Sequence, residues 1–166
     1  MSWIDGTVRD PDLRQHYAEV HHLAEWSPWV PFEEAASGAP REPGVYALRE
    51  PLIGVVRYVG MAGERAGSGR AQGLRGRLSA YRTGKGAISG FGEAALDRAL
   101  ADHEWVEQRL HDLRERGPRR ARDWVREAVD RLGLEVTWSV CVDRSDALYL
   151  ERQVVSLLRT SELWST

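Results

Sequence analysis

Cysteine, long apolar runs and net basic charge are scarce in this sequence, and each absence excludes a class of protein. Cys141 is the single cysteine among 166 residues, so the chain forms neither an internal disulfide nor a cysteine-rich zinc site. No run of about 18 apolar residues occurs, which excludes a membrane-spanning helix. The first six residues lack the basic and apolar regions of a secretory signal. We therefore expect a cytoplasmic protein with no membrane partner.

The net charge is −2, so composition alone does not indicate nucleic-acid binding. The charge is nevertheless unevenly distributed, because residues 57–85 contain seven basic residues and one acidic residue. Such a segment can bind phosphate in a weakly acidic chain, although a solvated surface balanced by acids from elsewhere fits equally well. The candidates for contact with nucleic acid are Arg57, Arg65, Arg70, Arg75, Arg82 and Lys85.

The periodicity of the apolar residues predicts a mixed α/β domain. Helices are expected at 9–25, 73–82, 93–115 and 119–132, with a last one capped by Ser145 or Asp146 and running to about 159. Strands are expected at 44–49, 54–61 and 134–142. Irregular segments are expected at 26–43, which is rich in proline, and at the glycine-rich stretches 62–72 and 84–92. This order indicates an α/β fold with a small sheet.

Both strands of the expected hairpin carry a tyrosine and a glycine on one face. Alternation places Gly44 with Tyr46, and Tyr58 with Gly60. A glycine within a strand leaves room for a ligand or another backbone, and a neighbouring tyrosine can present its hydroxyl to a substrate. Taken alone, the pair is explained more simply as two aromatics of the core.

Two helices carry polar residues on faces that their spacing turns toward the core. Arg77 and Tyr81 lie four residues apart and share a face flanked by leucines. A half-buried arginine needs an anion, either a phosphate or a structural carboxylate. Glu151 falls inside the apolar stripe of the last helix, where a carboxylate needs a salt bridge or a divalent ion such as Mg²⁺.

These motifs together resemble the GIY-YIG endonuclease family. Residues 44–46 (Gly-Val-Tyr) and 58–60 (Tyr-Val-Gly) resemble its paired signature. Residues 73–81 resemble its first helix, and residues 146–151 resemble the helix that carries its metal-binding glutamate. The resemblance implies a small antiparallel three-stranded sheet flanked by helices.

The resemblance also implies an organisation for the chain. It covers about 43–166, with a helical insertion at about 84–133. Residues 1–42 are then an N-terminal extension made of a helix and a segment rich in tryptophan and proline.

The activity implied by the resemblance is hydrolysis of DNA phosphodiester bonds with Mg²⁺ or Mn²⁺. Tyr58 or Tyr46 would orient or deprotonate the attacking water, and Tyr81 would support it through a hydrogen bond. Arg77 would neutralise charge on the phosphate, and Glu151 would hold the metal ion.

One position departs from the family pattern. The family has an asparagine after the glutamate helix, and this chain has Ser165 there, whose hydroxyl still forms hydrogen bonds but reaches less far. The alternative function is a catalytically inactive GIY-YIG-like module that binds nucleic acid. Members of the family act in restriction, repair and mobile elements, and the sequence does not choose among these roles.

Overall fold

The computed structural model describes residues 3–63, 73–85, 90–161 and 163–164. The chain divides into two compact units. The first contains residues 1–78 and 133–165, and the second contains residues 79–132. The boundary falls within helix α3 (Gly73–Arg82), which has the bounds that its periodicity predicts.

The first unit is built on one antiparallel sheet. Its strands, in the order β1-β4-β2-β3, are β1 (Val30–Pro31), β4 (Glu135–Val140), β2 (Gly44–Arg49) and β3 (Val56–Ala62). The three expected strands are all present, and β2 forms the interior of the sheet between β4 and β3. Val136, Trp138 and Val140 share a face, as their alternation predicts, because they pair with Leu48, Tyr46 and Gly44.

The expectation of three strands is wrong, because β1 adds a fourth. It lies in the proline-rich segment expected to be irregular, and two residues are too few to show a period. Pro31 is tolerated there because an edge strand does not need every backbone N–H for pairing. Ser27 extends the contact, since its backbone N–H donates to the Trp138 carbonyl at 2.8 Å and its Oγ accepts from the Trp138 N–H at 3.0 Å. The same segment also contains helix α2 (Phe32–Gly38).

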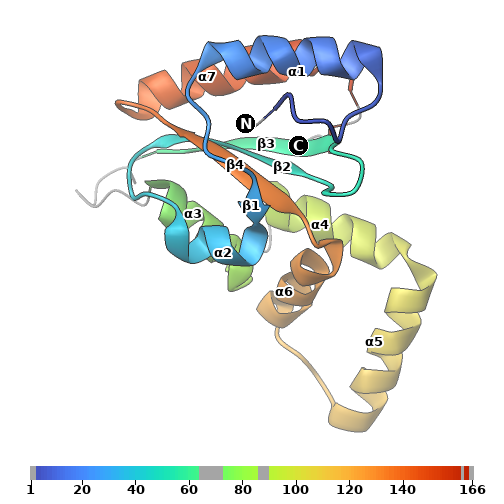
Figure 1. Ribbon diagram of the computed structural model, residues 1–166. Helices are drawn as coiled ribbons and strands as arrows, with labels where there is room; N and C mark the ends of the chain where they lie inside the picture. Colours follow the sequence, from blue (N-terminus) through green and yellow to red (C-terminus); the bar gives the residue numbers. More distant parts are fainter. Residues whose placement is uncertain (1–2, 64–72, 86–89, 162, 165–166) are drawn as a thin grey trace. The chain divides into compact units, whose positions relative to one another are not determined.

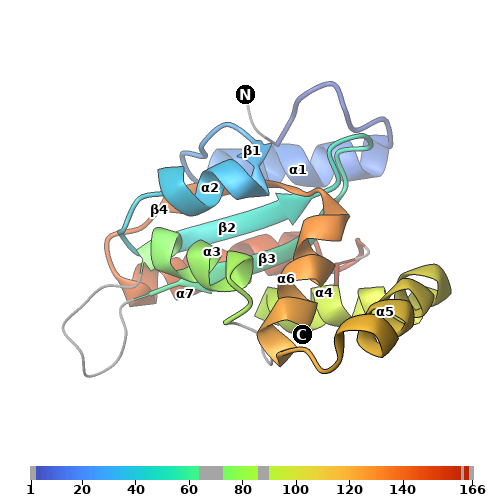
Figure 2. The ribbon, with the colours of Figure 1, turned by 90° about the horizontal axis from the view of Figure 1, so that it is seen from below.

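Helices cover both faces of this sheet (Figures 1 and 2). Helices α1 (Pro11–Leu23) and α7 (Arg144–Leu157) lie side by side on one face, and α2 and the start of α3 lie on the other. The core beneath α1 and α7 joins apolar residues of both helices to those of β2 and β3, and it includes Tyr17, Val20, Val45, Ala47, Leu150 and Val154.

Aspartates fix the starts of α1 and α7. Asp10 caps α1, because its Oδ1 accepts from the backbone N–H of Asp12 at 2.9 Å and of Leu13 at 3.1 Å. Asp143 caps α7 by accepting from the Asp146 N–H at 2.8 Å, so the expected cap at Ser145 or Asp146 is wrong by two residues or more.

The second unit is helical. It contains α4 (Gly90–Ala101), α5 (His103–Arg116) and α6 (Ala121–Leu132), and its small core is formed around Ala99, Trp105 and Ala128. The single helix expected at 93–115 is two helices, because Asp102 interrupts it and caps α5 by accepting from the Trp105 N–H at 3.2 Å.

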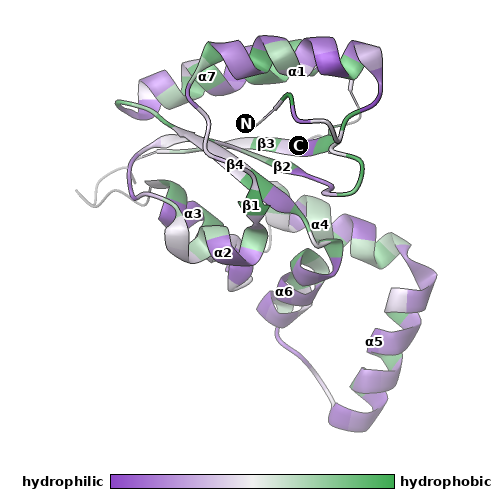
Figure 3. Ribbon diagram, in the orientation of Figure 1, coloured by the Kyte–Doolittle hydropathy of each residue, from purple (hydrophilic) through white to green (hydrophobic). Residues whose placement is uncertain are grey.

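Hydrophobic and hydrophilic residues are interspersed along the helices of both units (Figure 3). Within the described ranges, no helix has the length and apolar character needed to cross a membrane.

Tyr17 connects helix α1 to the start of β3. Its hydroxyl accepts a hydrogen bond of 2.8 Å from the backbone N–H of Val56, and its side chain is 1% exposed. We predict that Tyr17→Phe lowers the free energy of unfolding by about 1–2 kcal/mol, because the buried Val56 N–H loses its partner. Urea denaturation measures this. Tyr149→Phe is the control, since Tyr149 is 65% exposed, and equal unfolding midpoints for the two variants would contradict the prediction.

Candidate active site

Tyr46 and Tyr58 lie on the same face of the β2–β3 hairpin, as alternation predicts. The strands pair Tyr46 with Gly60 and Leu48 with Tyr58, so the tyrosines are diagonal neighbours. Their rings stack with 6.2 Å between centroids and 27° between planes. Their exposed fractions are 1% for Tyr46 and 5% for Tyr58. The pair is therefore a compact element of the sheet face, with Tyr58 slightly the more accessible.

The two motif glycines make close packing possible on this face. A Cβ at Gly60 would lie 2.6 Å from Cζ of Tyr46 and closer still to its hydroxyl, so the ring of Tyr46 extends across Gly60. A Cβ at Gly44 would lie 2.7 Å from Cδ1 of Leu74 on α3. Gly60 thus accommodates a tyrosine, and Gly44 accommodates the helix that carries Arg77.

Helix α3 presents Arg77 outward. Leu74, Leu78 and Tyr81 form its buried stripe, whereas Arg77 is exposed. The expectation that Arg77 is half-buried is therefore wrong, because it lies at the margin of the stripe and a long side chain extends from such a position into solvent. Tyr81 is part of the second unit, where its ring meets that of Phe91 edge-on with 5.5 Å between centroids.

Glu151 lies half-buried on α7, beside the buried residues Ala147 and Val154, as the apolar stripe predicts. Burial raises the pKa of its carboxyl group, and the positive charges of Arg152 and Arg77 partly oppose this rise. Arg77 on α3 and Glu151 on α7 are therefore within electrostatic range of each other, although α3 and α7 cover opposite faces of the sheet. Among the candidate residues, Tyr46 and Tyr58 are thus in ring contact, and the charge of Arg77 acts on Glu151 without a direct contact between the two side chains being established.

The residues around Glu151 suit one kind of metal site. Among the described residues, no three His, Cys, Asp or Glu side chains gather into a metal-binding group. Mg²⁺ usually keeps several waters and is held by one or two carboxylates together with substrate phosphates. Glu151 therefore fits a Mg²⁺ completed by water and phosphate, and does not fit a cation enclosed by protein ligands.

Some of the basic candidates for DNA contact take part in contacts within the protein. Arg57 forms a salt bridge with Glu50, with 3.3 Å between Nε and Oε1. Arg75 is half-buried and donates from Nε to the Ala39 carbonyl at 2.7 Å. Arg82 and Lys85 are exposed.

Three predicted residues, Arg65, Arg70 and Ser165, lie outside the described residues. The residue before Ser165 is described, and the backbone N–H of Trp164 donates to the Arg57 carbonyl at 2.6 Å. Trp164 therefore meets β3 one residue before Tyr58.

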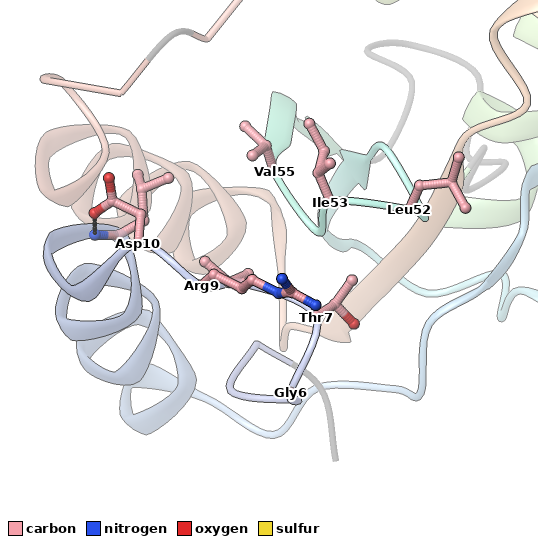
Figure 4. A pocket seen from close by; sticks show the side chains of 9 residues that line it. Gly6, Thr7, Arg9, Asp10, Leu52, Ile53 and Val55 are labelled. Atoms are coloured by element: carbon pink, nitrogen blue, oxygen red, sulfur yellow. Dashed lines mark hydrogen bonds between the residues drawn. The ribbon is translucent and has the colours of Figure 1, made fainter.

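Two cavities were not anticipated from the sequence. One of about 460 Å³ opens between the N-terminal segment and the turn of the hairpin, where Leu52 and Ile53 face Thr7 and Arg9 (Figure 4). Another of about 510 Å³ lies on α1 and α7 beside Tyr149. Neither cavity is lined by the predicted catalytic residues.

A second basic segment was also not anticipated. Residues 114–126 contain six arginines and two acidic residues, a bias that a count of charges along the sequence would have shown.

Comparison of the chain with models of protein families, with curated proteins and with solved structures finds no match in any of the three. The resemblance to GIY-YIG endonucleases therefore rests on the sequence motifs alone.

The close contact between Tyr46 and Gly60 can be tested by adding one methyl group. We predict that Gly60→Ala lowers the free energy of unfolding by about 1–3 kcal/mol, because the buried ring of Tyr46 has to move. Urea denaturation and the near-UV circular dichroism of the tyrosines would report the change. Gly38→Ala is the control, since a Cβ at Gly38 meets no atom within 4 Å. Unchanged stability of Gly60→Ala would show that the ring does not occupy this position.

The raised pKa of Glu151 predicts a dependence of stability on pH. A carboxyl whose pKa is higher in the folded state stabilises the fold while protonated, and this contribution disappears as the pH rises through the folded pKa. We therefore expect Glu151→Gln to raise the urea midpoint at pH 7, with the gain shrinking toward pH 4. Exposed Glu19, changed to Gln, is the control. A gain that is constant over this pH range would contradict the burial of an ionised Glu151.

Proposed function

We propose that this chain is a metal-dependent endonuclease of the GIY-YIG type that hydrolyses phosphodiester bonds in DNA. The observation that carries the proposal is the half-buried carboxyl of Glu151, which lies beside the buried residues Ala147 and Val154 on α7. Burial disfavours the ionised form of Glu151 and raises its pKa, so the ionised side chain opposes folding at neutral pH. A perturbed carboxyl of this kind is a candidate for a functional site.

Each side chain has a role that follows from its environment. The Arg77 guanidinium can neutralise the charge that develops on the phosphate, and its planar fork matches phosphate oxygens. Glu151 would hold a Mg²⁺ ion, which polarises the phosphate and makes bound water more nucleophilic at neutral pH. The hydroxyl of Tyr58 can orient the attacking water through a hydrogen bond.

The two stacked tyrosines have different roles in orienting the attacking water. Tyr58 is the more accessible of the two, so it is the candidate for contact with water. Tyr46 extends across Gly60 and stacks on Tyr58, and this contact fixes the orientation of the Tyr58 ring. In this proposal Tyr46 is a positioning residue.

A second candidate function is a nucleic-acid-binding module without catalysis. The observation that favours it is the burial of both tyrosines, which leaves little of either ring accessible to a substrate. This candidate predicts binding of DNA and no cleavage that depends on Mg²⁺.

Nicking of supercoiled plasmid separates the two functions. We expect the unmodified protein to nick plasmid with Mg²⁺ and not with EDTA. We expect Glu151→Gln and Arg77→Ala each to lower the rate by at least about tenfold, which corresponds to about 1.4 kcal/mol of barrier. Exposed Glu19→Gln and Arg159→Ala are matched controls with unchanged rates. Cleavage by the two test variants at the rates of their controls would exclude the proposed site, and binding without any nicking would favour the module.

A further inference from the structure

Four exposed arginines surround the connection between α5 and α6 in the second unit. They are Arg114, Arg116, Arg120 and Arg122, named here the connection arginines. In Figure 3 the end of α5 and the connection to α6 are strongly hydrophilic. The stretch from residue 114 to residue 122 contains no large apolar side chain. The connection itself therefore presents positive charge without a large apolar side chain of its own.

Most acidic residues near this connection are already paired with other arginines. Glu127 accepts hydrogen bonds from Arg119 and Arg109, with 2.9 Å and 2.6 Å between Nη1 and Oε2, and the bond from Arg119 is the main cause of its lowered pKa. Asp123 pairs with Arg126 at 3.5 Å. Glu115 meets His111 at 3.3 Å. None of the salt bridges between described residues includes a connection arginine.

The helix dipoles explain only half of the connection arginines. Arg114 and Arg116 occupy the last turn of α5, where a cation stabilises the helix by about 0.3–1 kcal/mol. Arg120 precedes α6 and Arg122 lies in its first turn, where the dipole disfavours positive charge. These two side chains do not stabilise the helix they adjoin, so the stability of α6 does not explain their positive charge.

The connection itself is held in place by its neighbours. Arg119 binds Glu127 with both terminal nitrogens and lies 5.7 Å from the centre of the Trp124 ring. Trp124 in turn packs edge-on against Trp105, with 5.8 Å between centroids. The connection arginines therefore project from an ordered turn, which reduces the entropic cost of binding an anion.

We propose that the connection arginines, none of which is a candidate active-site residue, form a DNA-binding surface that contacts the phosphate backbone. The choice of DNA rests on the proposed function. Guanidinium groups match phosphate oxygens, and backbone contacts of this kind position a protein on DNA without reading its sequence. An anionic membrane is less suitable as a partner, because binding there also uses several apolar side chains, and the stretch from residue 114 to residue 122 contains no large one.

Salt-dependent DNA binding tests this surface without requiring cleavage. Fluorescence anisotropy would measure binding of a labelled duplex in EDTA at about 50–200 mM NaCl, a range over which phosphate contacts change affinity strongly. We expect replacement of all four connection arginines by alanine to lower the slope of log K against log salt by about 3–4, or about 0.9 for each phosphate that the variant no longer neutralises. Affinity at low salt should fall at least about 100-fold. Replacement by lysine should restore most of the binding, because the charge is kept.

The matched control removes the same charge elsewhere. Arg9, Arg14, Arg144 and Arg159 are exposed residues of the first unit, and their joint replacement by alanine should change the slope by less than about 1. Equal decreases in the two alanine variants would overturn the proposal. So would unchanged DNA binding together with abolished binding to vesicles of phosphatidylcholine and phosphatidylserine.

Failure of this surface can be distinguished from failure of the proposed nuclease. If the connection arginines prove necessary for DNA binding but the unmodified protein does not nick plasmid, the proposal of a DNA-binding surface is supported and the proposal of a nuclease is rejected. If the protein nicks plasmid and the alanine variant binds DNA as the control variant does, the proposal of a nuclease is supported and the proposal of a DNA-binding surface is rejected. Circular dichroism of every variant confirms that the second unit is folded.

Discussion

Strand β2 is buried along its whole length, and its residues have to fit helices on both faces of the sheet. The strand ends in Arg49, a charged residue that is only 6% exposed. Asp5 and Glu135 bind its guanidinium at 2.7 Å and 2.8 Å, and the ring of Trp29 lies 4.4 Å from it. A buried charge is tolerated only when it is paired in this way, so the N-terminal segment, β4 and β2 have to be in place together.

The same constraint shapes the face that carries the tyrosines. Because β2 has neighbours on both sides and helices above and below, a tyrosine within it needs space from an adjacent strand. Gly60 provides that space for Tyr46, and Gly44 lets Leu74 approach from α3. The glycines and tyrosines of residues 44–46 and 58–60 can thus be explained by side-chain packing on this face of the sheet. Packing thereby fixes the positions of the two tyrosine side chains on this face of the sheet.

Local patterns predicted the elements that local forces determine. The bounds of β2 and α3 agree with expectation, because alternation and helical spacing are visible within a few residues. Strand β1 is too short to show a period, and the break at Asp102 depends on a single cap. The partners of Arg49 lie 44 and 86 residues away in sequence, so no local pattern indicates them.

In the candidate site, too, local sequence patterns predict some features and not others. The shared face of the tyrosines and the position of Glu151 follow from periodicity. The outward direction of Arg77 does not, because a residue at the margin of a stripe can turn either way. The contacts of Arg57 and Arg75 depend on which acid or carbonyl the fold brings beside them. Two of the connection arginines lie on α5, one precedes α6 and one lies on α6, so they have no common helical period.

The core beneath α1 and α7 has a practical consequence for anyone who expresses this protein in parts. Trp3, Val8, Tyr17 and Val20 belong to the same cluster as Val45 and Ala47. A fragment that starts at residue 43 would keep every motif, yet it would expose this apolar layer to water and leave Arg49 without Asp5. Such a fragment would be prone to aggregation, because newly exposed apolar patches drive association. The segment that carries the motifs begins near residue 43, whereas the unit that has to fold with it also includes the N-terminal residues.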